Sequence, residues 1–289
     1  MTDIPNLPVL NTAEVLRNYG LRPDKSLGQN FLQDDFALRK IVETAMITTK
    51  DSVLEIGPGL GSLTRYLAEL ANEVLAVELD GNLLPILNST LRGYKNVRII
   101  HNDILKLIIS DLIKDDDYLV VANVPYYITS AIVRHLLKPP PRPRRIVLTI
   151  QKEVAQRICS EPGDMSLLAL SVQVFGKPSI VSDIPAEAFY PEPNVDSSII
   201  KMEIFREPVI PSEDLDLFFR LAKAGFSQKR KTLRNSLSGG LSISSSASEH
   251  LIKSAGIDPK RRAETLNISE WKVLTSCAKD SGIFVQNRS

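Results

Sequence analysis

The segment NVPYY (123–127) places an amide, a proline and two aromatic rings directly after an apolar run. Its plain interpretation is a turn that contains proline. Its chemical interpretation starts from Asn123 and the Val124 carbonyl, which together can accept both hydrogens of an exocyclic amine. Pro125 stiffens the turn, and Tyr126 offers a face on which a nucleobase can stack. The pattern favours a pocket for a flat, amine-bearing ring.

A second constellation, EIGPGLG (55–61), places three glycines between an apolar stretch and a predicted helix. Glycine allows the backbone to approach a ligand closely, and the first turn of a helix presents unpaired N–H groups. The motif alone does not separate nicotinamide cofactors from S-adenosylmethionine or other nucleosides. We expect Glu55, inside the predicted strand, to fix the turn by accepting hydrogen bonds from backbone N–H groups.

Two acids follow at the ends of the next predicted strands. Glu78 stands 21 residues after Gly57, where an acid typically accepts hydrogen bonds from ribose hydroxyls. Asp103 ends the third strand, where a carboxylate can accept from an adenine amino group. Each acid alone is explained equally well as a solvated strand end. Together with the glycine turn they mark the carboxyl edge at which open α/β sheets bind ligands, and hydride transfer has no evident use for Asn123 there.

Alternating apolar strands and helical patterns connect these motifs. The predicted strands cover residues 53–56, 73–80, 97–104, 118–123 and 144–151. The predicted helices between them cover 36–47, a segment opening near 62, 83–91 with Pro85 in its first turn or at a kink, and 130–137. This alternation predicts an α/β fold with a parallel, doubly wound sheet. Two further strands, within 171–185 and 197–207, are expected to extend its edge antiparallel.

The chain changes character after residue 206. Residues 206–215 contain two prolines and four charged residues, and we interpret them as a domain boundary. Helices are predicted beyond it, at 213–226, 229–237, 247–255 and 269–280. The glycine- and serine-rich segment 238–248 is expected to be a flexible loop.

The overall composition excludes several classes of protein. The 289 residues are 43% hydrophobic and 24% charged, with a formal net charge of +1, which is typical of a soluble globular protein. Two distant cysteines and three scattered histidines predict no metal site and a reducing, cytoplasmic location. No apolar run reaches the roughly 18 residues of a membrane span, and the N-terminal residues resemble neither a signal nor a transit peptide.

The balanced net charge hides one basic stretch. Between Leu217 and Ser248 the chain has no acid and six basic residues: Arg220, Lys223, Lys229, Arg230, Lys231 and Arg234. Such a run is often an ordinary solvated helix face. Beside a pocket for a base, it favours a surface that contacts RNA phosphates. Shorter basic runs at 141–145 and 259–264 are expected to extend it.

Taken together, the motifs resemble one family. They are KSLGQNFL (25–32), EIGPGLG, ELD, ND, NVPY, FYPEPNVDS (189–197) and FSQKRKTLRNSL (226–237), and they span nearly the whole chain in the family's order. The chain resembles the bacterial ribosomal RNA adenine dimethyltransferases of the KsgA type. The resemblance implies a class I methyltransferase (Rossmann-like) fold, with a mostly parallel seven-stranded sheet and a small all-α C-terminal domain. It divides the chain into a catalytic domain (1–206) and an rRNA-recognition domain (207–289).

The resemblance also implies a reaction. The cofactor is S-adenosyl-L-methionine, and the products are two adjacent N6,N6-dimethyladenosines in the 3′-terminal hairpin of small-subunit rRNA. The implied cofactor-binding residues are Asn30, Leu32, Gly57, Glu78, Asp103 and Asn123. The implied residues on the side of the target base are Asn123, Val124, Tyr126 and Phe189. Val124, where the family more often has leucine, and residues 190–192 depart from the family pattern.

Three other interpretations stay open at this point. Large-subunit rRNA adenine methyltransferases of the macrolide-resistance type share the glycine and N-x-P-Y turns, but the segment 227–237 disfavours them. A ribosome-assembly checkpoint that binds immature small subunits is compatible with an intact catalytic site. A mitochondrial transcription factor on this fold is disfavoured by the N-terminal sequence. We expect a monomer, because no segment indicates self-association.

Overall fold

The computed structural model describes residues 4–113, 117–124, 128–137 and 140–282. The chain divides into two compact units. The first, here called the α/β unit, contains Met1–Ala155 and Pro178–Ile204. The second, the helical unit, contains Gln156–Lys177 and Phe205–Ser289. The predicted division at residue 206 into a catalytic and an RNA-recognition domain stays a prediction; by packing, residues 156–177 join the helical unit.

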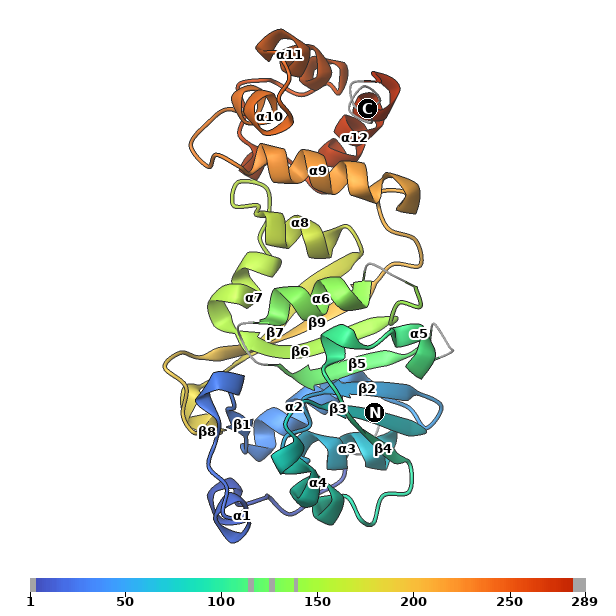
Figure 1. Ribbon diagram of the computed structural model, residues 1–289, viewed down its shortest axis with the longest axis vertical. Coiled ribbons are helices and arrows are strands. Elements are labelled where there is room, and N and C mark those ends of the chain that lie inside the picture. Colours follow the sequence, from blue (N-terminus) through green and yellow to red (C-terminus); the bar gives the residue numbers. More distant parts are fainter. Residues whose placement is uncertain (1–3, 114–116, 125–127, 138–139, 283–289) are drawn as a thin grey trace. The chain divides into compact units, whose positions relative to one another are not determined.

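A seven-stranded sheet forms the centre of the α/β unit (Figure 1). Its strands are β2 (Ser52–Ile56), β3 (Glu73–Glu78), β4 (Val97–His101), β5 (Leu119–Asn123), β6 (Arg145–Gln151), β7 (Gly176–Ile184) and β9 (Ser197–Ile204). They follow the order β4-β3-β2-β5-β6-β9-β7. The pairs among β2 to β6 are parallel, whereas β9 runs antiparallel to β6. The mostly parallel seven-stranded sheet inferred from the sequence is therefore confirmed.

The central strands are apolar on both faces because helices cover the sheet on both sides. Val53, Leu54, Val120 and Val121 are all fully buried. The helices that connect or flank the strands are α2 (Asp35–Ala45), α3 (Ser62–Leu70), α4 (Leu84–Thr90), α5 (Ile109–Leu112), α6 (Thr129–Leu137) and α7 (Lys152–Ile158). Pro85 stands in the first turn of α4. Backbone N–H groups in a first turn have no acceptor within the helix, so proline costs no hydrogen bond there.

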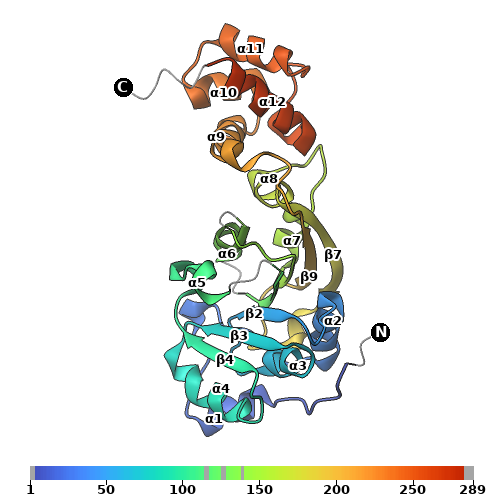
Figure 2. The ribbon, with the colours of Figure 1, turned by 90° about the vertical axis from the view of Figure 1, so that its right-hand side faces the viewer.

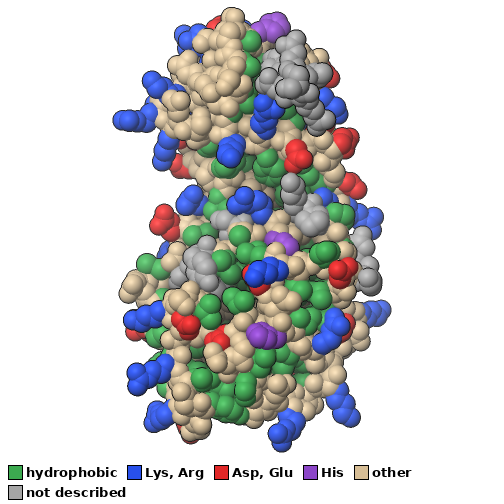
Figure 3. All heavy atoms as spheres, viewed as in Figure 1, with side chains coloured by type: hydrophobic (Ala, Val, Ile, Leu, Met, Phe, Trp, Pro, Cys, Tyr) green, Lys and Arg blue, Asp and Glu red, His purple; other side chains and the backbone are tan. Residues whose placement is uncertain are grey.

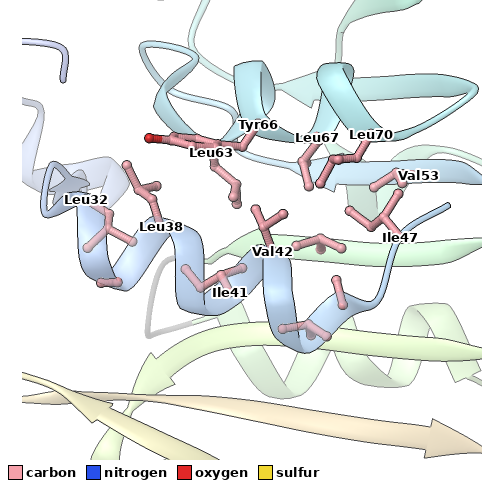
Figure 4. Close-up of a cluster of buried hydrophobic side chains, with 14 of the residues drawn as sticks. Leu32, Leu38, Ile41, Val42, Ile47, Val53, Leu63, Tyr66, Leu67 and Leu70 are labelled. Carbon is pink, nitrogen blue, oxygen red and sulfur yellow. The ribbon is translucent and has the colours of Figure 1, made fainter. Parts of the chain in front are cut away.

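A core cluster between α2 and α3 fixes one face of the sheet. Figure 4 shows Leu38 and Val42 of α2 pointing toward Leu63 and Leu67 of α3, and Ile41 belongs to the same cluster. These spacings of three and four residues place the side chains on one stripe of each helix. The cluster holds the start of α3, and with it the glycine turn, against the sheet.

The residues before α2 form elements that the sequence did not indicate. They are α1 (Thr12–Asn18), a 3₁₀ turn η1 (Lys25–Leu27) and the two-residue strand β1 (Phe31–Leu32). β1 pairs antiparallel with β8 (Phe189–Tyr190), with Leu32 opposite Phe189. Short strands of this kind carry no period-2 pattern long enough to detect in a sequence.

The helical unit contains α8 (Leu167–Gln173), α9 (Leu215–Gly225), α10 (Leu233–Leu241), α11 (Ser245–Ser254) and α12 (Ile268–Asp280). Helices α10 and α12 both pack on α9, and α11 packs on α10 and α12 (Figure 2). Trp271 is fully buried, with its ring 6.4 Å from Phe218 and 6.0 Å from Phe226. These aromatic contacts provide the unit with its own core.

Three predictions for this part of the chain need correction. The strand predicted within 171–185 is confirmed as β7, but residues 171–173 belong to α8, which Ser166 begins by accepting the Ala169 N–H as an N-cap. The helix predicted at 229–237 begins at Leu233, capped by Thr232. The loop predicted at 238–248 is mostly helical: α10 continues through Gly239 and Gly240, and Ser244 caps α11. Serine and glycine here serve capping and close packing, not flexibility.

Two neighbouring glycines in α10 provide a matched test of that packing. A Cβ on Gly240 would lie 2.7 Å from the Cα of Ala224 in α9, whereas one on Gly239 would meet only Gln228 Nε2 at 3.6 Å. We predict that Gly240→Ala lowers the free energy of unfolding by about 1–3 kcal/mol through overpacking. Gly239→Ala should raise it by about 0.5–1 kcal/mol, because alanine restricts the unfolded chain. Urea unfolding followed by circular dichroism measures both, and equal effects would contradict the close helix contact.

Candidate functional site

A hollow of the α/β unit lies where the parallel strands end. Its volume is about 1090 Å³, including space that is open to solvent. Its walls are residues 27–32 before α2, 55–60 of the glycine turn, 77–79 after β3, 102–104 after β4, and 123, 124 and 128 after β5. All six residues predicted to bind a cofactor line it: Asn30, Leu32, Gly57, Glu78, Asp103 and Asn123. Their roles stay predictions, but the fold brings them to one place.

The glycine turn has a backbone that only glycine adopts without strain. Gly57, Gly59 and Gly61 have φ angles of 70°, 60° and 87°. A Cβ on Gly59 would also lie 3.0 Å from the Phe31 ring, and one on Gly57 would lie 3.8 Å from the Asn123 carbonyl oxygen. The turn therefore lets a ligand approach the backbone at the start of α3.

Glu78 holds the glycine turn in place. Its Oε2 accepts the Gly59 N–H at 3.0 Å, and its Oε1 accepts the Asp80 N–H at 2.8 Å. Burial raises the pKa of Glu78, and both backbone hydrogen bonds act against that rise. Each oxygen retains a second lone pair, which is the capacity that two ribose hydroxyls need.

Glu55 does not have the role that we expected. It is 2% exposed, and its Oε2 has no hydrogen-bond partner within the described part of the chain. Burial raises the pKa of Glu55 to about 8, and the nearby charge of Glu78 acts in the same direction. Glu78 holds the turn instead, because its Oε2 accepts the Gly59 N–H. Glu55 lies before the turn, inside β2.

Asp103 stands between β4 and a short 3₁₀ turn (Ile104–Lys106). Its Oδ1 accepts the Leu105 N–H at 3.0 Å and caps that turn. Its Oδ2 lies 3.9 Å from Lys106 Nζ, and the Lys106 side chain is 78% exposed, so this ion pair is weak. The carboxylate is fixed in direction by its cap and keeps an oxygen for a donor in the pocket.

Asn123 and Asn30 join two walls of the pocket. The Asn123 Nδ2 donates to the Asn30 carbonyl oxygen at 3.1 Å. Its Oδ1 accepts no hydrogen bond from any described residue, so it is the acceptor that Asn123 presents. Val124 follows in the same wall, with its side chain 2% exposed. The amide is thereby oriented by the protein itself.

The aromatic residues predicted beside the target base are not all placed at the pocket. Phe189 is 2% exposed and belongs to the α2–α3 core cluster, because its pairing with Leu32 turns its side chain inward. It does not line the pocket. Tyr126, like Pro125 and Tyr127, lies outside the described residues. The stacking roles of Tyr126 and Phe189 stay predictions.

Several pocket residues were missed by reasoning from the sequence. Phe31 packs against Gly59, and Gln29 reaches Asp80 with a hydrogen bond of 2.7 Å. The apolar walls include Leu79, Leu83, Ile104 and Ile128. A single sequence offers no signal for these contacts, because Phe31 and Gly59 are 28 residues apart and Gln29 and Asp80 are 51 residues apart.

The predicted RNA-binding residues lie in the helical unit. In Figure 3, Lys and Arg side chains (blue) gather at the left edge of this unit, over the loop between α9 and α10. Five of the six are exposed: Arg220, Lys223, Lys229, Arg230 and Lys231. Arg234 is half-buried and pairs with Glu249 at 3.1 Å. Their function stays a prediction.

The shorter basic runs have structural partners instead. Arg144 pairs with Asp51 at 2.8 Å, and Arg145 pairs with Glu203 at 2.8 Å, so these two arginines hold strands together. Arg261 forms an ion pair with Glu270 of α12. The expectation that residues 141–145 and 259–264 extend the RNA-binding surface is therefore not supported by these side chains.

Two kinds of feature are absent from the part of the chain that is described. No group of three or more His, Cys, Asp or Glu side chains is arranged to hold a metal ion. No described helix combines the length and the apolar character needed to cross a bilayer.

Comparisons with known proteins agree with one another. The profile of the family described as Ribosomal RNA adenine dimethylase matches residues 20–278. The chain is 47% identical over 262 residues to Ribosomal RNA small subunit methyltransferase A of Dehalococcoides mccartyi (strain CBDB1), covering 90% of each chain. It is 42% identical over 274 residues to the protein of the same name from Clostridium botulinum (strain Okra / Type B1), covering 94% of this chain and 99% of that protein.

Two solved structures are similar over most of the chain. A dimethyladenosine transferase from Plasmodium falciparum has a TM-score of 0.76 and 26% identity, covering 87% of this chain and 98% of its own. The 23S rRNA methyltransferase ErmE has a TM-score of 0.70 and 27% identity, covering 86% and 100% respectively.

The buried Glu55 generates a prediction about pH. The pKa of Glu55 in the folded chain, about 8, lies above its ordinary value of 4.5. Between these values the unfolded chain has released the proton and the folded chain has not, so this group's contribution to stability falls as the pH rises and then levels off. Glu55→Gln should remove that part of the pH dependence. Urea unfolding of both proteins between pH 5 and pH 8 measures it, and parallel curves would contradict the raised pKa.

Proposed function

The chain belongs to the ribosomal RNA adenine dimethylase family and is an S-adenosylmethionine-dependent rRNA adenine dimethyltransferase. We propose that this enzyme dimethylates the N6 amines of two adjacent adenosines in the 3′-terminal hairpin of small-subunit rRNA. We further propose that the reaction is coupled to small-subunit maturation, on an immature subunit, by a cytoplasmic monomer. The observation that carries the chemistry is the oriented Asn123 amide in the wall of the pocket.

The pocket fits S-adenosylmethionine through its acceptors and its backbone. Glu78 has lone pairs available to ribose hydroxyls, and Asp103 has one oxygen available to an adenine amino group. The left-handed glycines 57 and 59 leave room at the start of α3, where unpaired N–H groups suit a carboxylate. Asn30 and Leu32 close the opposite wall. When bound, the cofactor supplies an electrophilic methyl group on a sulfonium.

The side of the pocket that receives the target is built around Asn123. With Nδ2 committed to Asn30, its Oδ1 accepts one N–H of the adenine amine, and the Val124 carbonyl is the proposed acceptor for the other. These two hydrogen bonds raise the electron density of N6 and direct its lone pair at the methyl group. No strong general base is needed, because the nitrogen becomes acidic once it is alkylated and its proton leaves to solvent.

Stacking completes the proposed base site. Tyr126 is assigned one face of the adenine, and Phe189 is assigned the other through the family resemblance. The ring of Phe189 is buried in the present conformation, so its role requires the β1–β8 pair to shift when the base enters. The target base must itself leave its stack before N6 reaches Asn123.

The helical unit is proposed to bind the rRNA. The exposed side chains of Lys229, Arg230 and Lys231 lie on the loop before α10, and no acid is present in the sequence from Leu217 to Ser248. A compact basic surface reads the shape of folded RNA rather than its sequence. Arg220, Lys223 and Arg234 are proposed to extend this surface along α9 and α10.

A large-subunit target is the main alternative, and one observation favours it: the fold extends to ErmE, a 23S rRNA methyltransferase. Identity is 27% to that enzyme, against 47% to a relative named for the small subunit. A checkpoint role in ribosome assembly is compatible with methylation, because binding to a subunit and catalysis can coexist.

The proposed target is tested by incubating the protein separately with small subunits, large subunits and naked rRNA. We expect labelled S-adenosylmethionine to transfer methyl groups to isolated small subunits, with N6,N6-dimethyladenosine recovered after nuclease digestion. Large subunits and naked rRNA serve as the comparison, in separate reactions. Label found only in large-subunit RNA would overturn the proposed substrate.

The role of Asn123 predicts a separation of binding from chemistry. We expect Asn123→Ala to bind S-adenosylmethionine within a few-fold of the unmodified protein, while single-turnover methyl transfer falls about 100-fold or more. Asn96→Ala is a suitable control, because the Asn96 amide caps α3 through Ala68 and Ala71 and does not line the pocket. Unchanged transfer by Asn123→Ala would rule out the amine-acceptor role.

A further inference from the structure

One wall of the pocket is a strap that two side-chain amides attach, at neighbouring residues, to the ends of two different strands. The strap comprises residues 24–32 and contributes residues 27–32 to the lining. Gln29 Nε2 donates to Asp80 Oδ2 at 2.7 Å, just beyond β3. At the next residue of the strap, the Asn30 carbonyl oxygen accepts a hydrogen bond from Asn123 Nδ2, at the end of β5.

Gln29 uses both atoms of its amide. While Nε2 donates to Asp80, Oε1 accepts the Asp24 N–H at 2.8 Å. The Gln29 N–H donates in turn to the Asp24 carbonyl oxygen at 3.2 Å. Gly28, with φ at 63°, makes the bend that allows these contacts. Gln29 therefore fixes the fold of the strap as well as its attachment.

Asp80 connects the strap to the cofactor acid. Its backbone N–H donates to Glu78 Oε1 at 2.8 Å, and Glu78 Oε2 accepts the Gly59 N–H. The Asp80 Oδ1 is occupied by the N–H and the Nδ2 of Asn82, at 3.0 and 2.9 Å. Oδ2 is left for Gln29, so an unbroken chain of hydrogen bonds runs from the glycine turn to the strap.

We propose that Gln29 and Asp80 form a latch that holds the strap closed over the cofactor pocket and so sets how tightly and how long S-adenosylmethionine is bound. Both are positioning residues, since Asp80 does not line the pocket and Gln29 acts by holding Gly28 to Leu32 in place. The proposal rests on the cofactor site proposed above. Release of the latch lets the part of the strap before Asn30 move away from Glu78, while Asn123 still holds Asn30.

The hydrogen-bond directions define a sharp exchange test. Gln29→Glu places two carboxylates against each other, and Asp80→Asn places two amide nitrogens against each other. In the double variant Gln29→Glu with Asp80→Asn, the new Asn Nδ2 donates to the new Glu carboxylate, which still accepts the Asp24 N–H. The Asn Oδ1 continues to accept from Asn82. Each single change breaks the latch, and the pair restores it.

The experiment measures affinity and dissociation rate for S-adenosylmethionine alone, by calorimetry and stopped flow. We expect each single variant to raise Kd by about tenfold, as for a lost hydrogen bond to a charged group, mainly through faster dissociation. The double variant should return to within about twofold. Asn82→Ala, which removes a contact to the same carboxylate but not to the strap, is the matched control and should leave Kd unchanged.

A further readout separates a latch from a general loss of structure. With rRNA substrate, single variants should raise KM for the cofactor far more than they lower kcat. Wild-type affinity in the single variants, or no recovery in the double variant, overturns the latch. Failure to methylate small subunits with normal cofactor binding would instead overturn the proposed function alone.

Discussion

The whole site depends on parallel strand pairing that continues past the end of β2. The Gly57 N–H donates to the Val77 carbonyl oxygen at 2.9 Å, so the first residue of the glycine turn is still hydrogen-bonded to β3. Asn123 is in turn held opposite Thr149 of β6. Because the strands are parallel, their polar ends lie at one edge, and the strand register determines the position of the pocket groups that follow the strands.

The second constraint is the treatment of buried charge. Burial raises the pKa of both Glu78 and Glu55. Two backbone N–H groups stabilise the ionised form of Glu78, whereas Glu55, one strand away, lacks a partner for Oε2. This difference comes from backbone geometry. Both residues are glutamates near the ends of neighbouring strands, so the sequence does not distinguish them.

The sequence was sufficient for the parts of the molecule that depend on regular patterns. Apolar strands that alternate with helices predicted the sheet, and Gly57, Glu78, Asp103 and Asn123 were identified because strand ends meet at one edge. The failures have local causes. Serine and glycine in residues 238–248 indicated a loop, but Ser244 is a cap and Gly240 a packing contact. Glu55 was expected to fix the turn from its place in the motif, and only the structure reveals that its Oε2 lacks a partner. Phe189 was assigned through the family resemblance, and its burial in the core depends on tertiary packing.

The ion pairs of Glu249 change the electrostatics of the helical unit. This acid lies one residue beyond the basic stretch, and it pairs with Arg234 at 3.1 Å and with Lys253 at 2.7 Å. An arginine that is already neutralised within the protein displaces no counterion when it meets a phosphate. The ionic-strength dependence of any polyanion bound there therefore reflects fewer cations than the sequence contains, and loss of Glu249 would steepen it without adding a positive charge.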